Sequence, residues 1–291
     1  MRRRNRLMSL VCTATLAAAC HTEERSFDEE QTKVDVAFAQ LEKAVDEAPG
    51  LEPFLEIDHR RRGLAVGASM PPARVALFRA PALELTAVIA NPKAAIEFPM
   101  RALVYGDPSG TVQMAYNSFE FVGTRHGLLN QALGTKYDGI LERLAKAVDV
   151  PSHATALPTE EGDGLIVHDA EGTVADVTAR LKSAVEEVDG AVFFGAIDYQ
   201  AEAKAAGKDI PPLTLVLFGN PGAGAPAMAD LPELGLDQFC QKVVIWEDRT
   251  GVHTAHNDVG WQAARRGGGK SLARAKVRLG LGATVGGAAK P

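Results

Sequence analysis

The sequence contains few cysteines, and their positions exclude a disulfide-stabilised body. Of the three cysteines among 291 residues, Cys12 and Cys20 lie close to the N-terminus, which leaves Cys240 alone in the rest of the chain. A single cysteine cannot form an internal disulfide, so hydrophobic cores must hold the fold together. Cys240 lies beside an apolar run and is expected to pack as a small hydrophobic residue.

Long hydrophobic runs are also scarce. The apolar stretch from Leu7 to Ala19 is about a dozen residues, which is too short to span a bilayer as a permanent helix. Four arginines precede it, and this order is typical of a signal peptide, here residues 1–20. The segment Leu16-Ala17-Ala18-Ala19-Cys20 resembles a bacterial lipobox, although Ala17 stands where leucine is usual. The resemblance implies export and lipidation of Cys20.

Acidic residues are absent after Asp258, whereas seven basic residues follow it. Removal of the four arginines of residues 1–20 changes the formal net charge from −6 to −10. An acidic body argues against nucleic acid as a partner, because that binding depends on phosphate neutralisation. Residues 259–291 are rich in Gly, Ala and basic residues and are predicted to form a disordered tail.

Familiar catalytic and cofactor motifs are missing as well. The sequence has no Gly-x-Ser-x-Gly elbow, and no Lys-Ser/Thr pair directly follows the glycine-rich loop Gly219-Asn220-Pro221-Gly222-Ala223-Gly224. His253 and His256 are three residues apart on a predicted strand and therefore point to opposite faces, so no metal site is predicted. No cofactor can be assigned from the sequence.

What the chain does contain is an internal repeat. Met70-Pro71-Pro72 recurs as Ile210-Pro211-Pro212, and Leu77-Phe78 recurs as Leu217-Phe218, in each case 140 positions later. Tyr116-Asn117 recurs at the same spacing as His256-Asn257. A register kept over this length indicates two copies of one domain.

Hydrophobic periodicity predicts the order helix, strand, short helix, strand, short helix, strand, strand in each copy. The fold class is therefore α+β, with two copies of a two-layer α/β domain in which helices cover one face of a mixed sheet. The first repeat is assigned to residues 27–130, a helix and linker to 131–164, and the second repeat to 165–258.

These features resemble a bacterial and archaeal family, the domain of unknown function numbered 302. The segment from Ile210 to Pro221, then Trp246-Glu247-Asp248 and His256-Asn257, is similar to the family hallmark. The first copy keeps Pro71-Pro72 and adds Arg125-His126-Gly127, which resembles the closing motif of the family. It departs at Arg79-Ala80 and at Gly106. The resemblance implies a small α+β domain and supplies no chemistry.

Several polar residues at strand ends are candidates for a site. Glu247 and His256 form a possible acid–base pair if the hairpin between their strands brings them together. The candidates for ligand binding, which include a glycine-rich loop before a short helix, are Asp198, Gly219, Asn220, Gly222 and Asn257. The alternative is structural: Asn220 makes an Asx turn, and the Asp and Asn residues cap helices and hairpins. Any pocket is expected in the second copy.

Two functions remain open from the sequence. The first is a membrane-tethered binding or scaffold protein, whose repeats form an intramolecular pseudo-dimer that recognises a small molecule or an envelope protein. The alternative is an envelope enzyme with its site in the second repeat. His21 follows Cys20 where an aspartate would favour inner-membrane retention, so the periplasmic side of the outer membrane or the cell surface is expected.

Overall fold

The computed structural model describes residues 27–155 and 159–290. The first repeat consists of α1 (Phe27–Asp46), β1 (Glu52–Asp58), α2 (His59–Leu64), β2 (Ala73–Arg79), α3 (Pro81–Ala90), η1 (Pro92–Glu97), β3 (Met100–Gly106), β4 (Val112–Asn117), α4 (Phe119–Arg125), α5 (Gln131–Ala147) and β5 (Ser152–Thr155). The second repeat consists of β6 (Leu165–Ala170), α6 (Val174–Glu186), β7 (Val192–Asp198), α7 (Tyr199–Ala205), β8 (Leu213–Gly219), α8 (Pro221–Met228), η2 (Pro232–Leu236), β9 (Gln241–Asp248), β10 (Gly251–Asn257), α9 (Val259–Arg265) and α10 (Leu272–Ala288).

Each repeat forms a sheet of five strands. The strand order is β1-β2-β3-β4-β5 in the first sheet and β6-β10-β9-β8-β7 in the second. The first sheet is mixed because β4 and β5 run parallel, as the sequence predicted. The second sheet is antiparallel in all four of its strand pairs, so the prediction of a mixed sheet is wrong there. The two sheets differ because their edge strands are not equivalent elements. Strand β5 follows α5 and runs parallel to β4, whereas β6, which was not predicted, precedes α6 and runs antiparallel to β10.

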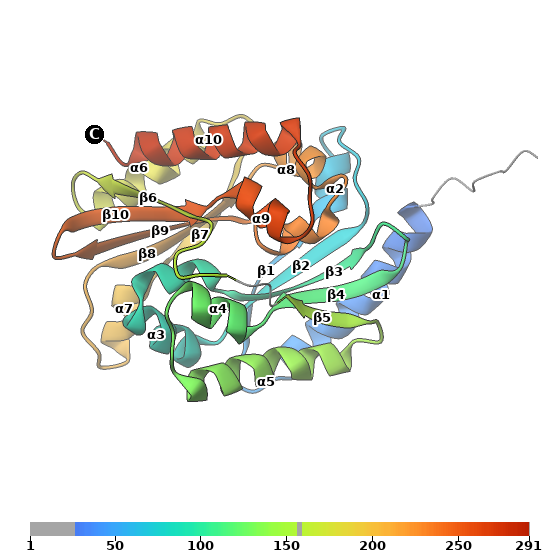
Figure 1. Cartoon of the computed structure of the whole chain (residues 1–291), viewed down its shortest axis with the longest axis horizontal. Coiled ribbons are helices and arrows are strands. Elements are labelled where there is room, and N and C mark those ends of the chain that lie inside the picture. The colour runs from blue at the N-terminus through green and yellow to red at the C-terminus, as the bar shows by residue number, and fades with distance from the viewer. Residues whose placement is uncertain (1–26, 156–158, 291) are drawn as a thin grey trace, which may run out of the picture.

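The outer face of each sheet is covered by two helices. Helices α1 and α5 lie on the first sheet, and α6 and α10 lie on the second, so that α5 and α10 form opposite outer layers of the molecule (Figure 1). The core between the second sheet and its helices is a separate cluster that includes Val177 and Leu181 of α6, Val243 of β9 and Val285 of α10. The fold class predicted from the sequence, two α+β domains with helices packed on sheets, is confirmed.

The inner faces of the two sheets face each other and share one core. Buried side chains from both repeats, among them Leu103 and Leu215, belong to the same hydrophobic cluster. The packing is reciprocal: η2 lies against β3 of the first repeat, and η1 lies against β9 of the second. Helix α2 packs against α8, and α3 packs against α7. The repeats therefore meet through the same elements from each side, as the two halves of a symmetric dimer do.

A second set of contacts explains why the first repeat departs from the pattern at Arg79. The guanidinium of Arg79 binds Glu202 of α7 at 2.7 and 2.8 Å, and its Nε donates to Glu84 at 2.8 Å. The Tyr199 hydroxyl lies 3.1 Å from the same Glu84 carboxylate. The second repeat has glycine at the equivalent position, so this ion cluster exists on only one side of the interface.

The predicted disordered tail at residues 259–291 is the main error of the sequence analysis. Helix α9 begins directly after its cap, Asp258, and α10 follows, with Leu281 and Val285 buried against α6 and the second sheet. The strand β5 likewise lies within the segment predicted to be a linker. The predicted signal peptide and Cys20 lie outside the described residues.

Candidate functional site

A cluster of buried charges lies where the two repeats meet. Glu97 accepts hydrogen bonds from Arg101 Nη2 at 2.9 Å and from Arg125 Nη1 at 2.6 Å. Asp237 accepts from the same Arg101 nitrogen at 2.8 Å and from Arg265 Nη2 at 2.9 Å. Glu97 and Asp237 are 140 positions apart, as are Arg125 and Arg265. The cluster therefore follows the two-fold relation of the repeats, and each of its arginines has a carboxylate partner.

The asparagines at the ends of β4 and β10 belong to this cluster. Asn117 Nδ2 donates to Asp237 Oδ1 at 2.7 Å, and Asn257 Oδ1 accepts from Arg125 Nη2 at 2.7 Å. Each asparagine thus binds a residue of the opposite repeat and is almost fully buried. The sequence analysis offered Asn257 as a cap or a ligand-binding residue, whereas the structure uses its side chain to join the repeats.

The two buried carboxylates at the interface, Glu97 and Asp237, predict that the stability of the fold depends on pH. Burial by itself raises the pKa of Glu97 and of Asp237, but the adjacent arginines hold each pKa well below its usual range. Because the native pKa values lie below the unfolded values of about 4, the stabilisation is complete above that pH and is lost as pH falls further. We expect the urea midpoint, measured from pH 7 to pH 2, to fall steeply below about pH 4. A midpoint that is constant across this range would contradict the ion cluster.

The proposed acid–base pair of Glu247 and His256 is not formed. In the β9–β10 hairpin Glu247 pairs with Val252, whereas His256 pairs with Val243. Four residues therefore separate the two along the ladder, which is about 13 Å at about 3.3 Å per residue. Glu247 is exposed and His256 is buried, with Nδ1 3.1 Å from the Asn257 carbonyl oxygen. Burial lowers the pKa of His256.

Two of the ligand-binding candidates cap helices. Asp198 Oδ1 accepts a hydrogen bond from the Ala201 amide at the start of α7. Asn220 Oδ1 accepts from the Ala223 amide at the start of α8, and its Nδ2 donates to the Asp189 carbonyl at 2.9 Å. Both ends of the Asn220 amide are therefore occupied. The side chains of Asp198 and Asn220 therefore have the structural roles, helix cap and turn, that the sequence offered as the alternative to ligand binding.

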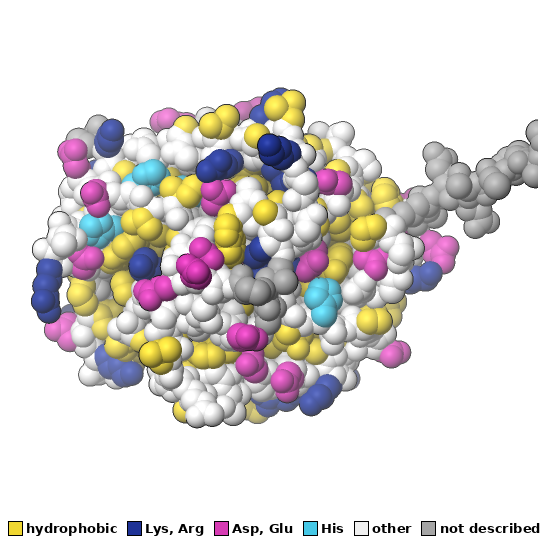
Figure 2. All heavy atoms as spheres, in the orientation of Figure 1, with side chains coloured by type: hydrophobic (Ala, Val, Ile, Leu, Met, Phe, Trp, Pro, Cys, Tyr) yellow, Lys and Arg dark blue, Asp and Glu magenta, His cyan; other side chains and the backbone are white. Residues whose placement is uncertain are grey.

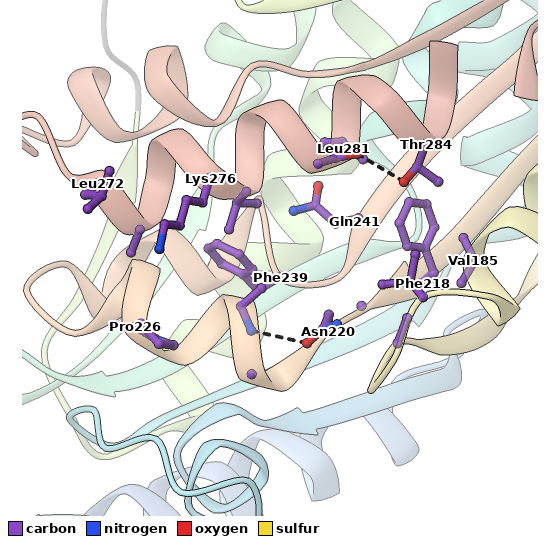
Figure 3. A pocket seen from close by; sticks show the side chains of 18 residues that line it. Val185, Phe218, Asn220, Pro226, Phe239, Gln241, Leu272, Lys276, Leu281 and Thr284 are labelled. Carbon is purple, nitrogen blue, oxygen red and sulfur yellow. Dashed lines mark hydrogen bonds between the residues drawn. The ribbon is translucent and has the colours of Figure 1, made fainter. Parts of the chain in front are cut away.

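The glycine-rich loop nevertheless borders a cavity. A space of about 510 Å³ lies between α10 on one side and α6, α8 and the strands β8 and β9 on the other (Figure 3). Its lining is mainly apolar and consists of Val185, Val188, Ala191, Phe218, Gly219, Asn220, Gly222, Ala223, Pro226, Phe239, Gln241, Leu272, Ala273, Lys276, Val277, Gly280, Leu281 and Thr284. This volume lies within the range of small-molecule sites, roughly 300–1,000 Å³.

The first repeat has larger side chains at the equivalent places. Its counterpart of α10 is α5, which packs on α1, α3 and α4 as α10 packs on α6, α8 and α9. At the 140-residue spacing, four buried side chains of the first repeat have smaller counterparts in the cavity wall: Leu83 and Ala223, Leu133 and Ala273, Tyr137 and Val277, and Leu144 and Thr284. At four positions around the cavity, the side chains of the second repeat are therefore smaller than those of the first.

One buried polar side chain, Gln241, reaches this cavity. It pairs with Phe218 in the sheet, as Met100 of the first repeat pairs with Phe78, so a glutamine replaces a buried methionine of similar length. Gln241 is only 7% exposed, and its Nε2 has no hydrogen-bond partner within the described chain. Figure 3 shows the amide between the rings of Phe239 and Phe218, beneath α10. An unsatisfied buried amide is destabilising unless a ligand or water occupies the space.

Sequence reasoning found the loop side of this site and missed the helix that covers it. Gly219, Asn220 and Gly222 were predicted ligand-binding residues, and all three line the cavity. The contribution of α10 was missed because the repeat was followed only as far as Asp258. The signal was present, since Leu281 stands 140 positions after Leu141, and both are buried.

The described residues contain neither a candidate metal site nor a reactive thiol. Within residues 27–155 and 159–290 there is no group of three or more His, Cys, Asp or Glu side chains placed to hold a metal ion. Cys240 is buried as expected, and burial raises the pKa of its thiol to about 12, so the thiolate is not formed near neutral pH. Among those same residues, no helix has the length and apolar character needed to cross a membrane.

Comparison with known proteins agrees with the repeat. Residues 27–149 and 166–279 each match the family described as "Domain of unknown function DUF302". Of solved structures, an uncharacterised conserved DUF302 protein from Bacillus stearothermophilus is similar at 13% identity and a TM-score of 0.36, over 43% of this chain and 97% of that one.

Curated relatives from Brucella match over part of the chain. A protein of Brucella suis biovar 1 (strain 1330) named "Fluoride-specific ion channel FluC 1" is 32% identical over 127 residues, which is 43% of this chain and 49% of that protein. Its namesake in Brucella abortus biovar 1 (strain 9-941) is also 32% identical over 127 residues, covering 46% of its own length. The chain thus spans about half the length of the curated relatives it matches.

Proposed function

The chain belongs to the DUF302 family and carries two copies of its domain, and we propose that it is an exported, membrane-tethered binding protein. The anchor of this proposal is Cys20, at the end of the lipobox-like segment. The two repeats act as an intramolecular pseudo-dimer. In this arrangement the first repeat is the structural partner, and the second repeat holds a small, mainly apolar ligand in the cavity under α10.

The observation that carries the proposal is the difference between the repeats around Gln241. Where the first repeat buries Met100 among large side chains, the second has a cavity and an amide nitrogen that has no partner among the residues the structure describes. Random loss of packing would leave an apolar void, which is destabilising. A polar group directed into that void is typical of ligand sites, which combine an apolar wall with a few placed polar groups.

The test is native mass spectrometry of residues 21–291, which include the whole described structure, after export to the periplasm of a bacterial host. We expect an additional mass that is lost on denaturation. The variant Ala273→Leu/Val277→Tyr transfers the first-repeat side chains Leu133 and Tyr137 into the cavity. It is expected to lose the bound mass while gaining about 0.5–2 kcal/mol in free energy of unfolding, since filling a cavity stabilises a fold.

The matched control lies on the outer face of the same helix. Ala275→Leu/Leu279→Tyr makes the same kinds of change at the same spacing, but neither residue lines the cavity, and Leu279 is 75% exposed. This variant should keep the bound mass. If the wild-type protein is free of ligand and stays so after incubation with host lipid and metabolite extracts, the binding proposal is wrong, and a scaffold role is favoured instead.

A further inference from the structure

We propose that the cavity of the second repeat binds an anionic lipid with a single acyl chain. In this arrangement the chain lies along α10 toward Val185, an oxygen of the acyl or carboxyl group accepts a hydrogen bond from Gln241, and the negative charge pairs with Lys276. The inference rests on the proposed binding function and specifies its ligand class.

The shape of the cavity favours a linear ligand. Its wall includes residues of α10 from Leu272 to Thr284, which correspond to about 18 Å at about 1.5 Å per residue. A volume of about 510 Å³ distributed over this length is narrow. Val185 and Phe218 line the end near Thr284, away from Leu272 (Figure 3). An extended alkyl chain fits such a space, whereas a fused ring system requires a wider one.

The charge of the site favours an anion. Lys276 is the one charged side chain among the residues that line the cavity, and no carboxylate lines it. Its neighbours on α10 are already paired: Arg274 binds Asp230 at 2.7 Å, and Arg278 binds Asp258 at 2.9 Å. Within the part of the chain that the structure describes, Lys276 has no acidic partner. An unpaired ammonium beside an apolar channel suits the head group of an anionic amphiphile.

The amide of Gln241 requires that the ligand also carry an acceptor inside the cavity. A plain hydrocarbon would leave the Nε2 donor buried and unsatisfied, which is unfavourable by about 1–3 kcal/mol. A carboxylate or ester carbonyl oxygen would accept this hydrogen bond. In Figure 3, Gln241 lies farther along α10 than Lys276, with Phe239 between them. The two polar contacts are thus separated along the channel, as the ester carbonyl and the phosphate are in a lysophosphatidic acid.

The entrance of the cavity is suited to a lipid. Leu272 lies at the end near Lys276 and is 75% exposed, although it is a large apolar side chain. Lys and Arg side chains lie beside apolar ones along the upper edge of the molecule, over α10 (Figure 2). An apolar rim beside basic groups is typical of a surface through which an anionic lipid enters.

The inference is tested by isothermal titration calorimetry of delipidated residues 21–291 with amphiphiles kept below their micelle concentrations. The probes are decanoate, dodecanoate, lauroyl lysophosphatidic acid, dodecanol and dodecyltrimethylammonium. We expect both anions to bind more tightly than dodecanol and the ammonium. The affinity should rise about fourfold for each methylene between decanoate and dodecanoate. The stronger of the two anions identifies the source as a free fatty acid or a phospholipid product.

Two variants separate the polar contacts. Lys276→Met should weaken the binding of lauroyl lysophosphatidic acid by about two- to fivefold and leave the binding of dodecanol unchanged, because a partly exposed ion pair contributes modestly. Gln241→Met, which introduces the residue of the first repeat, should weaken the binding of lauroyl lysophosphatidic acid and of dodecanol alike by about tenfold. Arg278→Met removes one positive charge from the same helix outside the cavity and should have no effect on either ligand.

The outcomes distinguish this inference from the proposed function. If dodecanol and dodecyltrimethylammonium bind as tightly as dodecanoate, or if Lys276→Met is without effect, the anionic lipid is excluded while a binding role remains. If no amphiphile binds but native mass spectrometry finds another bound mass, the ligand class alone is wrong. If neither method finds a ligand, both proposals fail together.

Discussion

Replacement of Asp237 by asparagine is expected to lower the free energy of unfolding by about 3–5 kcal/mol. The carboxylate is fully buried and accepts hydrogen bonds from three arginines, Arg101, Arg265 and Arg266, as well as from Asn117. Asparagine keeps the shape but not the charge, so the buried guanidinium groups lose their counter-ion. Urea denaturation at pH 7, followed by circular dichroism, measures the change.

The same chain offers a control, Asp169→Asn, and an independent second test, Glu97→Gln. Asp169 also binds a basic partner, His253 at 3.0 Å, but its side chain is 94% exposed, so Asp169→Asn should change stability by less than about 0.5 kcal/mol. Glu97→Gln, at the two-fold related position, should be destabilising to a similar extent as Asp237→Asn. If Asp237→Asn has no larger effect than Asp169→Asn, the interface is not closed as described.

Replacement of Lys242 by methionine is expected to stabilise the protein by about 1–4 kcal/mol near pH 6. Lys242 pairs with Leu217 in the sheet as Arg101 pairs with Leu77, so the two cations are related by the repeat. Arg101 reaches carboxylates of both repeats, whereas Lys242 Nζ is buried without a hydrogen-bond partner among the described residues. Burial, with the nearby charge of Arg101, lowers the pKa of Lys242 to about 7.

The effect of this variant should depend on pH with a definite sign. The pKa of lysine in the unfolded chain is about 10.4. Between pH 7 and that value the native state gives up a proton that the unfolded state keeps, so the wild-type protein becomes more stable as pH rises. The advantage of Lys242→Met is therefore largest below pH 7 and shrinks toward pH 10. Lys182→Met, at an exposed site on α6, should show no such trend. A destabilising Lys242→Met would mean that the ammonium has a counter-ion.

The sequence predicted the repeat and the order of its elements because hydrophobic spacing is a local signal. Helix α6 has a capping box at its N-terminus, formed by Thr173 and Asp176, and the double prolines Pro211-Pro212 lie in the connection before β8. Strand β6 and helix α10 were not predicted. Both depend on partners distant in sequence, since β6 is stabilised by pairing with β10, and α10 by packing on α6.

The site was harder to predict than the fold. Several of the polar residues at strand ends that were predicted as site residues cap helices or join the repeats, as Asp198 and Asn257 do. The cavity arises because the second repeat has the small residues Val277 and Ala273 where the first repeat has Tyr137 and Leu133. Small residues in a helix give no sign of a cavity until the helix has been placed against its neighbours.

The reciprocal interface also constrains the order in which the protein can be made. Translation proceeds from the N-terminus, so Arg101 and Arg125 are made long before Asp237 and Asn257, their partners in the second repeat. Until more than a hundred further residues have followed, the inner face of the first repeat lacks the second-repeat partners of these two arginines. The first repeat can therefore complete its packing only after the second repeat has been made.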